Sequence, residues 1–317
     1  MSDNRNTKTR RAENFIEVLV ERTFQRVIRG DYSYDRDVRE LRRYQKQAQK
    51  LDARSLEARI LNCLAILQNV SGRSTRALRQ FQEIYKLYEA LDDKKRMAST
   101  LGNMASAHMT QGNYEEATAI TERALALISA EDDYDVYRFL LEKKMSMALK
   151  NEDYGTVDSI YKRFQAILTE FGNDDKHTYA EYMSGVYQIM AEREMAREDY
   201  QQARRYINLA TEFAEGLELT FGLAPIYCTQ AHLALREQQD TALAEEYWQK
   251  MQDTLKGIHS PSHIGRDYIE EARYLQRHGY LDKAAEFAQR AISIFEQFEM
   301  PEDMALAGQL LQFIQGT

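Results

Sequence analysis

The chain has 317 residues, of which 44% are hydrophobic, so it can bury the core of one large domain or two ordinary ones. It has only 14 glycines and 3 prolines, too few turn-forming residues for an all-β protein of this size, and good helix formers dominate. The composition therefore predicts an all-α fold, and the net charge of −8 argues against bulk nucleic-acid binding.

The N-terminal section is basic in an otherwise acidic chain, because residues 1–50 contain 13 Lys or Arg against 8 Asp or Glu. We expect a disordered basic tail over 1–11 and then an amphipathic helix over 12–29. Its apolar side is predicted to contain Phe15, Ile16, Leu19, Val20, Thr23 and Val27. The main interpretation of the positive charge is a tail followed by a solvated helix face, and the alternative is a docking surface for an acidic partner.

A segment of about 40 residues then recurs along the chain. Each copy has a helical pattern of about sixteen residues, a turn, a small residue and a second helical pattern. The small residues that align the copies are Ala77, Ala117, Val157, Ala203, Ala244 and Ala284. One insertion of about six residues, around 171–178, interrupts the period. The sequence therefore predicts stacked helix pairs.

Signals for helix starts support this division. The acidic pairs Asp92–Asp93, Asp132–Asp133 and Asp174–Asp175 precede the first helix of a unit, and we interpret them as N-caps, not as metal-binding loops. A final helix is predicted over 301–315, begun by Pro301, with Glu302 and Asp303 favourable at its positive end.

The pattern resembles the tetratricopeptide repeat (TPR), which has apolar residues at positions 4, 7, 24 and 27 and small residues at positions 8 and 20. The first clear unit reads Leu61, Leu64, Ala65, Ala77, Phe81 and Ile84 at positions 4, 7, 8, 20, 24 and 27. In the six clear units these positions are all apolar except Thr121, Lys144, His232 and Glu271. Small residues at positions 8 and 20 allow two helices to cross closely, so the larger Met145 and His232 at position 8 require adjusted packing.

The resemblance implies a right-handed α-solenoid of about seven antiparallel helix pairs with a C-terminal capping helix. We expect a single domain over 12–317. Its units are predicted at about 12–51, 52–92, 93–132, 133–173, 174–221, 222–259 and 260–299, with the cap at 301–315. Units of about 40 residues are similar to those of kinesin light chains and of bacterial peptide receptors and regulators.

No group of residues predicts catalysis, a cofactor site or a metal site, so we expect a non-enzymatic protein. Cys228 and His232 have the i, i+4 spacing of metal ligands, but both occupy packing positions of the repeat. His259 and His263 are too few for a structural zinc and are interpreted as loop residues. The chain has 20 tyrosines, and those at turns, such as Tyr114, are interpreted as interhelix packing, not as a stacking platform for single-stranded nucleic acid.

Stacked units of this kind present the first helix of each pair to a concave groove, which suits an extended peptide or a helix of a partner protein. Repeat positions 2, 5, 6, 9, 12 and 13 should face this groove. The predicted partner-binding residues are Arg59, Asn62, Ser99, Asn103, Ser106, Lys143, Ser146, Gln188, Gln230, Arg266 and Arg273. In ligand-binding TPR proteins an Asn at position 6 often holds the main chain of the ligand, and the resemblance transfers this role to Asn103.

We therefore expect a protein- or peptide-binding scaffold. The alternative is a ligand-gated regulator, in which a peptide changes the solenoid and so controls a partner. An RNA-binding solenoid would need a basic groove. This is not predicted, because Glu142, Glu192 and Glu270 also lie at groove positions and nearly balance the basic residues there. The two distant cysteines, the lack of an apolar run near the ~20 residues that span a membrane and the lack of a signal sequence favour the cytoplasm and no membrane partner.

Overall fold

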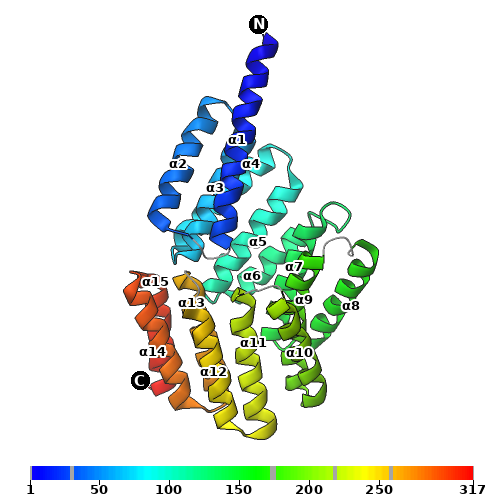
Figure 1. Cartoon of the computed structure of the whole chain (residues 1–317), viewed down its shortest axis with the longest axis vertical. Coiled ribbons are helices and arrows are strands. Elements are labelled where there is room, and N and C mark those ends of the chain that lie inside the picture. Colours follow the sequence, from blue (N-terminus) through cyan, green and yellow to red (C-terminus); the bar gives the residue numbers. More distant parts are fainter. Residues whose placement is uncertain (1, 29–31, 172–175, 217–219, 257–259, 317) are drawn as a thin grey trace. The chain divides into compact units, whose positions relative to one another are not determined.

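The structure is a computed structural model of the chain, and it describes residues 2–28, 32–171, 176–216, 220–256 and 260–316 (Figure 1). In these ranges all regular secondary structure is helical, which confirms the predicted all-α fold. The elements are α1 (Ser2–Ile28), α2 (Tyr34–Lys50), α3 (Arg54–Val70), α4 (Ser74–Ala90), α5 (Lys94–Thr110), α6 (Tyr114–Leu125), α7 (Tyr134–Lys150), α8 (Tyr154–Phe171), α9 (Lys176–Ala196), α10 (Tyr200–Gly216), α11 (Thr220–Leu233), the π-helical segment η1 (Ala234–Gln238), α12 (Thr241–Lys256), α13 (Pro261–Arg277), α14 (Leu281–Gln297) and α15 (Pro301–Gln315).

The helices form consecutive packed pairs, and two compact units can be separated by their contacts. Unit 1 comprises Met1–Leu127 and His259–Thr317, and unit 2 comprises Ile128–Ile258. The expected unit boundaries and the single solenoid over 12–317 stay predictions, and α11 begins at Thr220, before the expected boundary at 222. The expected insertion around 171–178 lies partly outside the described residues, as does the acidic pair Asp174–Asp175.

The core follows the repeat register. The six aligning residues at position 20, Ala77, Ala117, Val157, Ala203, Ala244 and Ala284, all have 0% exposure. The residues at position 8 are equally enclosed, including Met145 at 0% and His232 at 5%. Close helix crossings therefore lie where the sequence predicted them.

Many of the helices end in the same kind of turn, and the regular spacing of these turns sets the length of the repeat. Asp52, Gly72, Asp92 and Gly112 all have positive φ, from 53° to 77°, and they are spaced by twenty residues. After each of them the next N–H donates to the carbonyl five residues earlier, as from Asp93 to Tyr88 at 3.0 Å. This left-handed cap ends first and second helices alike, so the unit of 40 consists of two similar halves.

Aspartates begin many of the helices. Asp93 accepts a hydrogen bond from the N–H of Arg96 at 3.1 Å, and Asp133 accepts one from Val136 at 2.9 Å, which confirms these two predicted N-caps. Asp153, Asp199 and Asp240 accept the corresponding bonds at the starts of α8, α10 and α12. The predicted start of α15 is confirmed as well, with Pro301 in its first turn.

Helix α1 begins at Ser2, so it includes most of the segment expected as a tail. Ile16, Val20, Thr23 and Val27 are buried, as predicted. Phe15 is 66% exposed, which corrects the predicted apolar side. Its Cβ direction lies about 110° around the helix from the centre of the buried face, and this rotation turns it towards solvent.

A buried carboxylate joins α1 to α2. The Asp37 side chain has 0% exposure and accepts hydrogen bonds from Arg26 at 2.6 Å and from the N–H of Ser33 at 2.8 Å. Burial alone would raise the pKa of Asp37, but these bonds and that from Arg36 lower it below its ordinary value. The first helix pair is thus fixed by an ionised, fully hydrogen-bonded group.

In unit 1 the C-terminal helices also contact the N-terminal repeats. Helices α13, α14 and α15 pack in succession, and α13 reaches α3. Thr75 donates to Glu302 at 2.7 Å, and Arg266 donates to Thr110 at 2.6 Å. Contacts between such distant repeats were not predicted, because a simple solenoid has contacts only between neighbours.

Unit 2 has its own core. Helices α9, α10 and α11 bury a cluster that includes Ala191, Met195, Ile207 and Ile226. Arg193 of α9 forms two ion pairs in this unit. Its partners are the neighbouring Glu194 and Asp158 of α8. None of the described helices combines the length and apolar character that crossing a lipid bilayer requires.

Candidate functional site

A cleft of about 160 Å³ in unit 1 lies between α1, α3 and α5, and Tyr88 of α4 also lines it. It contains three of the predicted groove residues, Arg59, Asn62 and Ser99. The cleft is lined by Val20, Glu21, Phe24, Arg59, Asn62, Cys63, Tyr88, Arg96, Ser99 and Thr100. The structure therefore brings part of the predicted site together around one concave surface.

Helical spacing explains which side chains meet here. On α5, Arg96, Ser99 and Asn103 follow at i, i+3 and i+7 and share one face. On α3, Arg59 and Asn62 share the corresponding face. Asn103 donates from Nδ2 to Oδ1 of Asn62 at 3.4 Å, a long bond that joins the two predicted groove amides across the helices.

The cleft carries two guanidinium groups. Arg59 pairs with Glu17 and Glu21 of α1, the second at 3.5 Å, and Arg96 pairs with Asp93 at 2.8 Å. Burial, and then the positive charge of Arg96, lower the pKa of Arg59. Since arginine stays charged at any physiological pH, the cleft retains two cations, and each of them is already in contact with at least one carboxylate.

The inner wall is neutral. Cys63 and Tyr88 are each 2% exposed, and burial raises the pKa of both to about 12. The thiol and the phenol therefore stay protonated near neutral pH, where a thiol is a poor nucleophile. This wall offers contact and hydrogen bonds to a ligand.

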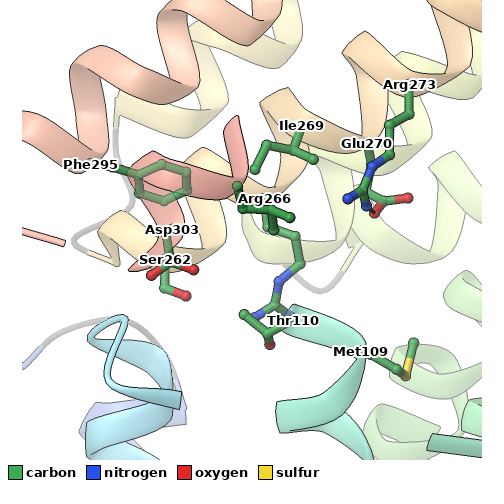
Figure 2. A pocket seen from close by; sticks show the side chains of 10 residues that line it. Met109, Thr110, Ser262, Arg266, Ile269, Glu270, Arg273, Phe295 and Asp303 are labelled. Carbon is green, nitrogen blue, oxygen red and sulfur yellow. Dashed lines mark hydrogen bonds and ion pairs between the residues drawn. The ribbon is translucent and has the colours of Figure 1, made fainter. Parts of the chain in front are cut away.

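The other predicted residues of unit 1 have partners within the chain. Ser106 donates to the carbonyl of Gly102 at 3.1 Å. Arg266 extends towards Thr110, while Arg273 lies beside Glu270 (Figure 2). Arg273 bonds Glu270 at 2.9 Å and the hydroxyl of Tyr114 at 3.1 Å. These two arginines therefore join the C-terminal helices to the end of α5 and the start of α6.

The predicted residues of unit 2 lie on its first helices, α7, α9 and α11. The Lys143 ammonium lies 5.1 Å from the centre of the Phe139 ring. Gln188 donates to Thr229 at 3.1 Å and to Glu192, and Gln230 donates to Thr211 at 3.2 Å. Ser146 is half-buried. Their role as partner-binding residues stays a prediction.

The described residues that were considered for metal binding lie on two different helices. Cys228 and His232 are buried on α11, at 8% and 5% exposure, and His263 lies 2.6 Å from Ser260 Oγ. His259 falls outside the described residues. In the described ranges no three His, Cys, Asp or Glu side chains are grouped so that they could hold a metal ion.

Sequence reasoning missed several residues of the cleft. Arg96 precedes the groove positions of its repeat, and Tyr88 belongs to a second helix, so the repeat register selects neither. The i, i+3, i+7 spacing from Arg96 to Asn103 could have identified the arginine. The contribution of Glu21 and Phe24 from α1 depends on how that atypical first helix packs, which the register does not specify.

Comparison with known proteins supports the helix-pair interpretation. A sequence model of the family described as tetratricopeptide repeat matches residues 56–130, which include α3 and α5 of the cleft. No curated protein sequence matches significantly.

Two solved structures share the fold. A tetratricopeptide repeat protein from Parabacteroides merdae is 16% identical, with a TM-score of 0.51, and the match covers 95% of this chain and 98% of that one. A Rap protein, solved in complex with Competence and Sporulation Factor, is 10% identical, with a TM-score of 0.56, and the match covers 96% and 98%. At these identities the likeness shows the fold alone.

Proposed function

We propose that this chain, which contains tetratricopeptide repeats, binds an extended peptide or a helix of a partner protein in the cleft between α1, α3 and α5. The observation that carries the proposal is the convergence of Arg59, Asn62 and Ser99 on this cleft, with Arg96 beside them. Asn103 is not among the lining residues but donates a hydrogen bond to Asn62, which lines the cleft. Binding without catalysis is the activity that these groups support best.

The size and chemistry of the cleft favour a peptide. A space of about 160 Å³ is small beside the cavities that enclose cofactors or drug-sized ligands, but it accommodates side chains of a bound segment. Asn62 and Asn103 offer amide donors and acceptors that match a peptide main chain of any sequence. The cleft therefore supports recognition of both main chain and side chain.

The charges favour an acidic side chain or a terminal carboxylate. Two guanidinium groups line the cleft, and planar guanidinium groups match carboxylates in geometry as well as charge. Glu17 and Glu21 already place carboxylates against Arg59. An acidic ligand would compete with these two residues of α1 for the same arginine.

The test begins with selection of binders from a random displayed-peptide library and continues with calorimetric titration of the strongest peptide. Asn103→Ala should weaken binding by about 1–3 kcal/mol, because a main-chain group of the ligand loses its partner. Gln82→Ala, at an exposed position of α4, is the matched control and should bind like the parent. Unchanged affinity of Asn103→Ala would refute the cleft as the binding site.

A second candidate function is a ligand-gated regulator. It is favoured by the contacts of Arg266 with Thr110 and of Arg273 with Tyr114, which engage predicted groove residues inside unit 1. A ligand that opened these contacts would change the arrangement of the repeats, and the shared fold with a Rap protein solved with a bound factor is compatible with this. Small-angle scattering with and without the selected peptide tests it, since a scaffold should keep its radius of gyration and a gated regulator should change it.

A further inference from the structure

A second crevice in unit 1, of about 190 Å³, lies where the first turn of α15 meets the start of α4 and the end of α5. Its polar lining consists of Ser74, Thr110, Gln111, Glu302, Asp303 and Gln309. It shares Thr110 and Asp303 with a smaller cavity of about 10 Å³, which is also lined by Ser262 and Arg266. Figure 2 shows Asp303 and Ser262 close together, with Arg266 directed away towards Thr110.

Three buried side-chain oxygens around these spaces have no hydrogen-bond partner among the described residues, and neither has the buried Nε of Arg266. The oxygens are Oδ2 of Asp303, Oγ of Ser74 and Oγ of Ser262. The three residues are 8%, 3% and 1% exposed. Buried polar atoms are almost always paired with protein or water, so these oxygens have unused hydrogen-bonding capacity.

The backbone brings the Asp303 carboxylate close to the α3–α4 turn. A Cβ atom added to Gly72 would lie 2.7 Å from Asp303 Oδ2 and 2.0 Å from Met300 Cε. Gly72 also has a φ of 74°, a conformation that glycine adopts without strain. The turn therefore covers Asp303 without offering its Oδ2 a donor.

Negative charge predominates in the crevice. Its charged lining residues are Glu302 and Asp303, and Glu302 already accepts a hydrogen bond from Thr75. In the adjoining cavity Glu270 and Arg273 pair with each other, and Arg266 donates to Thr110. The carboxylate of Asp303 is thus the acceptor that lacks a matching donor on Oδ2.

We propose that this crevice binds a primary ammonium group, that of a lysine side chain presented by a partner protein. An ammonium group has three donors and no acceptor, so it can bond Asp303 Oδ2, Ser74 Oγ and one further oxygen of the lining. An anion would be repelled by both carboxylates. In the described ranges no three His, Cys, Asp or Glu side chains are grouped here so that they could hold a metal ion.

The energetics of Asp303 support a binding role. Burial raises the pKa of Asp303 to about 6, Arg266 lowers it and Glu302 raises it further. The group is therefore ionised at neutral pH at some cost to folding, and a bound cation would offset this cost. A buried, poorly neutralised carboxylate beside a crevice is the kind of group that is frequent at functional sites.

The experiment uses the full chain with ¹³C-labelled methyl groups and follows the signals of Ala305 and Leu306, which line the crevice. The probe is Nα-acetyl-lysine-N-methylamide, and the neutral isostere Nα-acetyl-norleucine-N-methylamide is the ligand control. The lysine probe should shift both signals in a saturable manner and the norleucine probe should not. Butylamine as a third ligand distinguishes a site for any free amine from one that also needs the peptide groups.

Asp303→Asn should weaken binding of the lysine probe by about 10- to 100-fold, because a charged hydrogen bond is lost. Asp282→Asn, an exposed carboxylate in the first turn of α14, is the matched control and should not change the affinity. Ser74→Ala, which keeps the carboxylate, should weaken binding less. Arg59→Ala should have no effect, so that failure here and failure of the α1–α3–α5 cleft are distinguishable.

Binding should also tighten as the pH rises from about 5 to about 7.5, as Asp303 ionises. The other charged groups that face Asp303 are Glu302 of its own helix and Arg266, Glu270 and Arg273 of α13. Equal shifts with the lysine and norleucine probes, no shift with either, or unchanged affinity of Asp303→Asn would each overturn the proposal. The last two results would mean that the unpaired oxygens bind buried water only.

Discussion

Two glycines of the C-terminal helices show how single residues limit the packing. Gly265 of α13 allows the buried Phe295 ring to approach, since an added Cβ would lie 2.2 Å from two ring atoms. Gly308 of α15 has no atom within 4 Å of such a Cβ. Both lie inside helices, so the two positions differ mainly in the space around them.

Gly265→Ala should therefore destabilise unit 1 by about 1–3 kcal/mol through overpacking. Gly308→Ala should stabilise it by about 0.5–1 kcal/mol, because alanine is the better helix former. Urea unfolding followed by circular dichroism measures both. If both substitutions changed the free energy of unfolding with the same sign and size, Phe295 would not pack on Gly265.

Asp303 makes stability depend on pH in a direction opposite to that of an ion-paired carboxylate. Its pKa is about 6, above the ordinary 3.8, so the folded state binds more protons than the unfolded state between these values. Stability should fall as the pH rises from about 4 to about 6 and stay lower above that range.

Asp303→Asn removes this effect and should raise the free energy of unfolding by about 1–3 kcal/mol at neutral pH. Near pH 4 the variant and the parent should differ little, since the carboxyl is then protonated. Thermal unfolding at the two pH values measures the difference. A variant less stable than the parent at neutral pH would show that the carboxylate makes favourable contacts that outweigh its burial.

At the scale of elements, close crossing of the paired helices is the feature that gives the fold its regularity. Ala105 on α5 has 0% exposure at position 8 of its repeat, where α5 meets its partner α6. Ala105→Leu should destabilise the protein by about 1–3 kcal/mol, as the larger side chain separates the helices.

Ala119→Leu, at an exposed position of α6, is the control and should change stability by no more than about 0.5 kcal/mol. Differential scanning calorimetry measures the melting temperatures of the two variants and of the parent. A melting temperature of Ala105→Leu equal to that of the parent would contradict the repeat register.

Much of the element level could be predicted from the sequence, because helix pairs repeat with a fixed period and buried positions recur with it. Ala77 and Ala117 identified the close crossings, and Asp93 and Asp133 identified helix starts. Arg266, in contrast, was expected to face a free groove, yet it bonds Thr110, which lies 156 residues away. A contact between distant repeats leaves no periodic signal in the sequence, and neither does the crevice at Asp303.

At the scale of the whole chain, two compact units are each built of helix pairs, and the candidate cleft belongs to one of them. The family match over 56–130 covers α3 and α5 of the cleft but not α1. The first helix, which supplies Glu17 and Glu21 opposite Arg59, lies outside that match. We expect recognition of an acidic ligand to depend on Arg59.

A charge exchange tests this claim most directly. In calorimetric titrations with the selected acidic peptide, Arg59→Glu should lose at least about tenfold in affinity, while Arg79→Glu, at an exposed position of α4, should bind like the parent. Replacing one acidic residue of the peptide by lysine should restore binding to Arg59→Glu and weaken binding to the parent. Equal affinity of the parent and Arg59→Glu for the acidic peptide would show that Arg59 does not bind an acidic ligand.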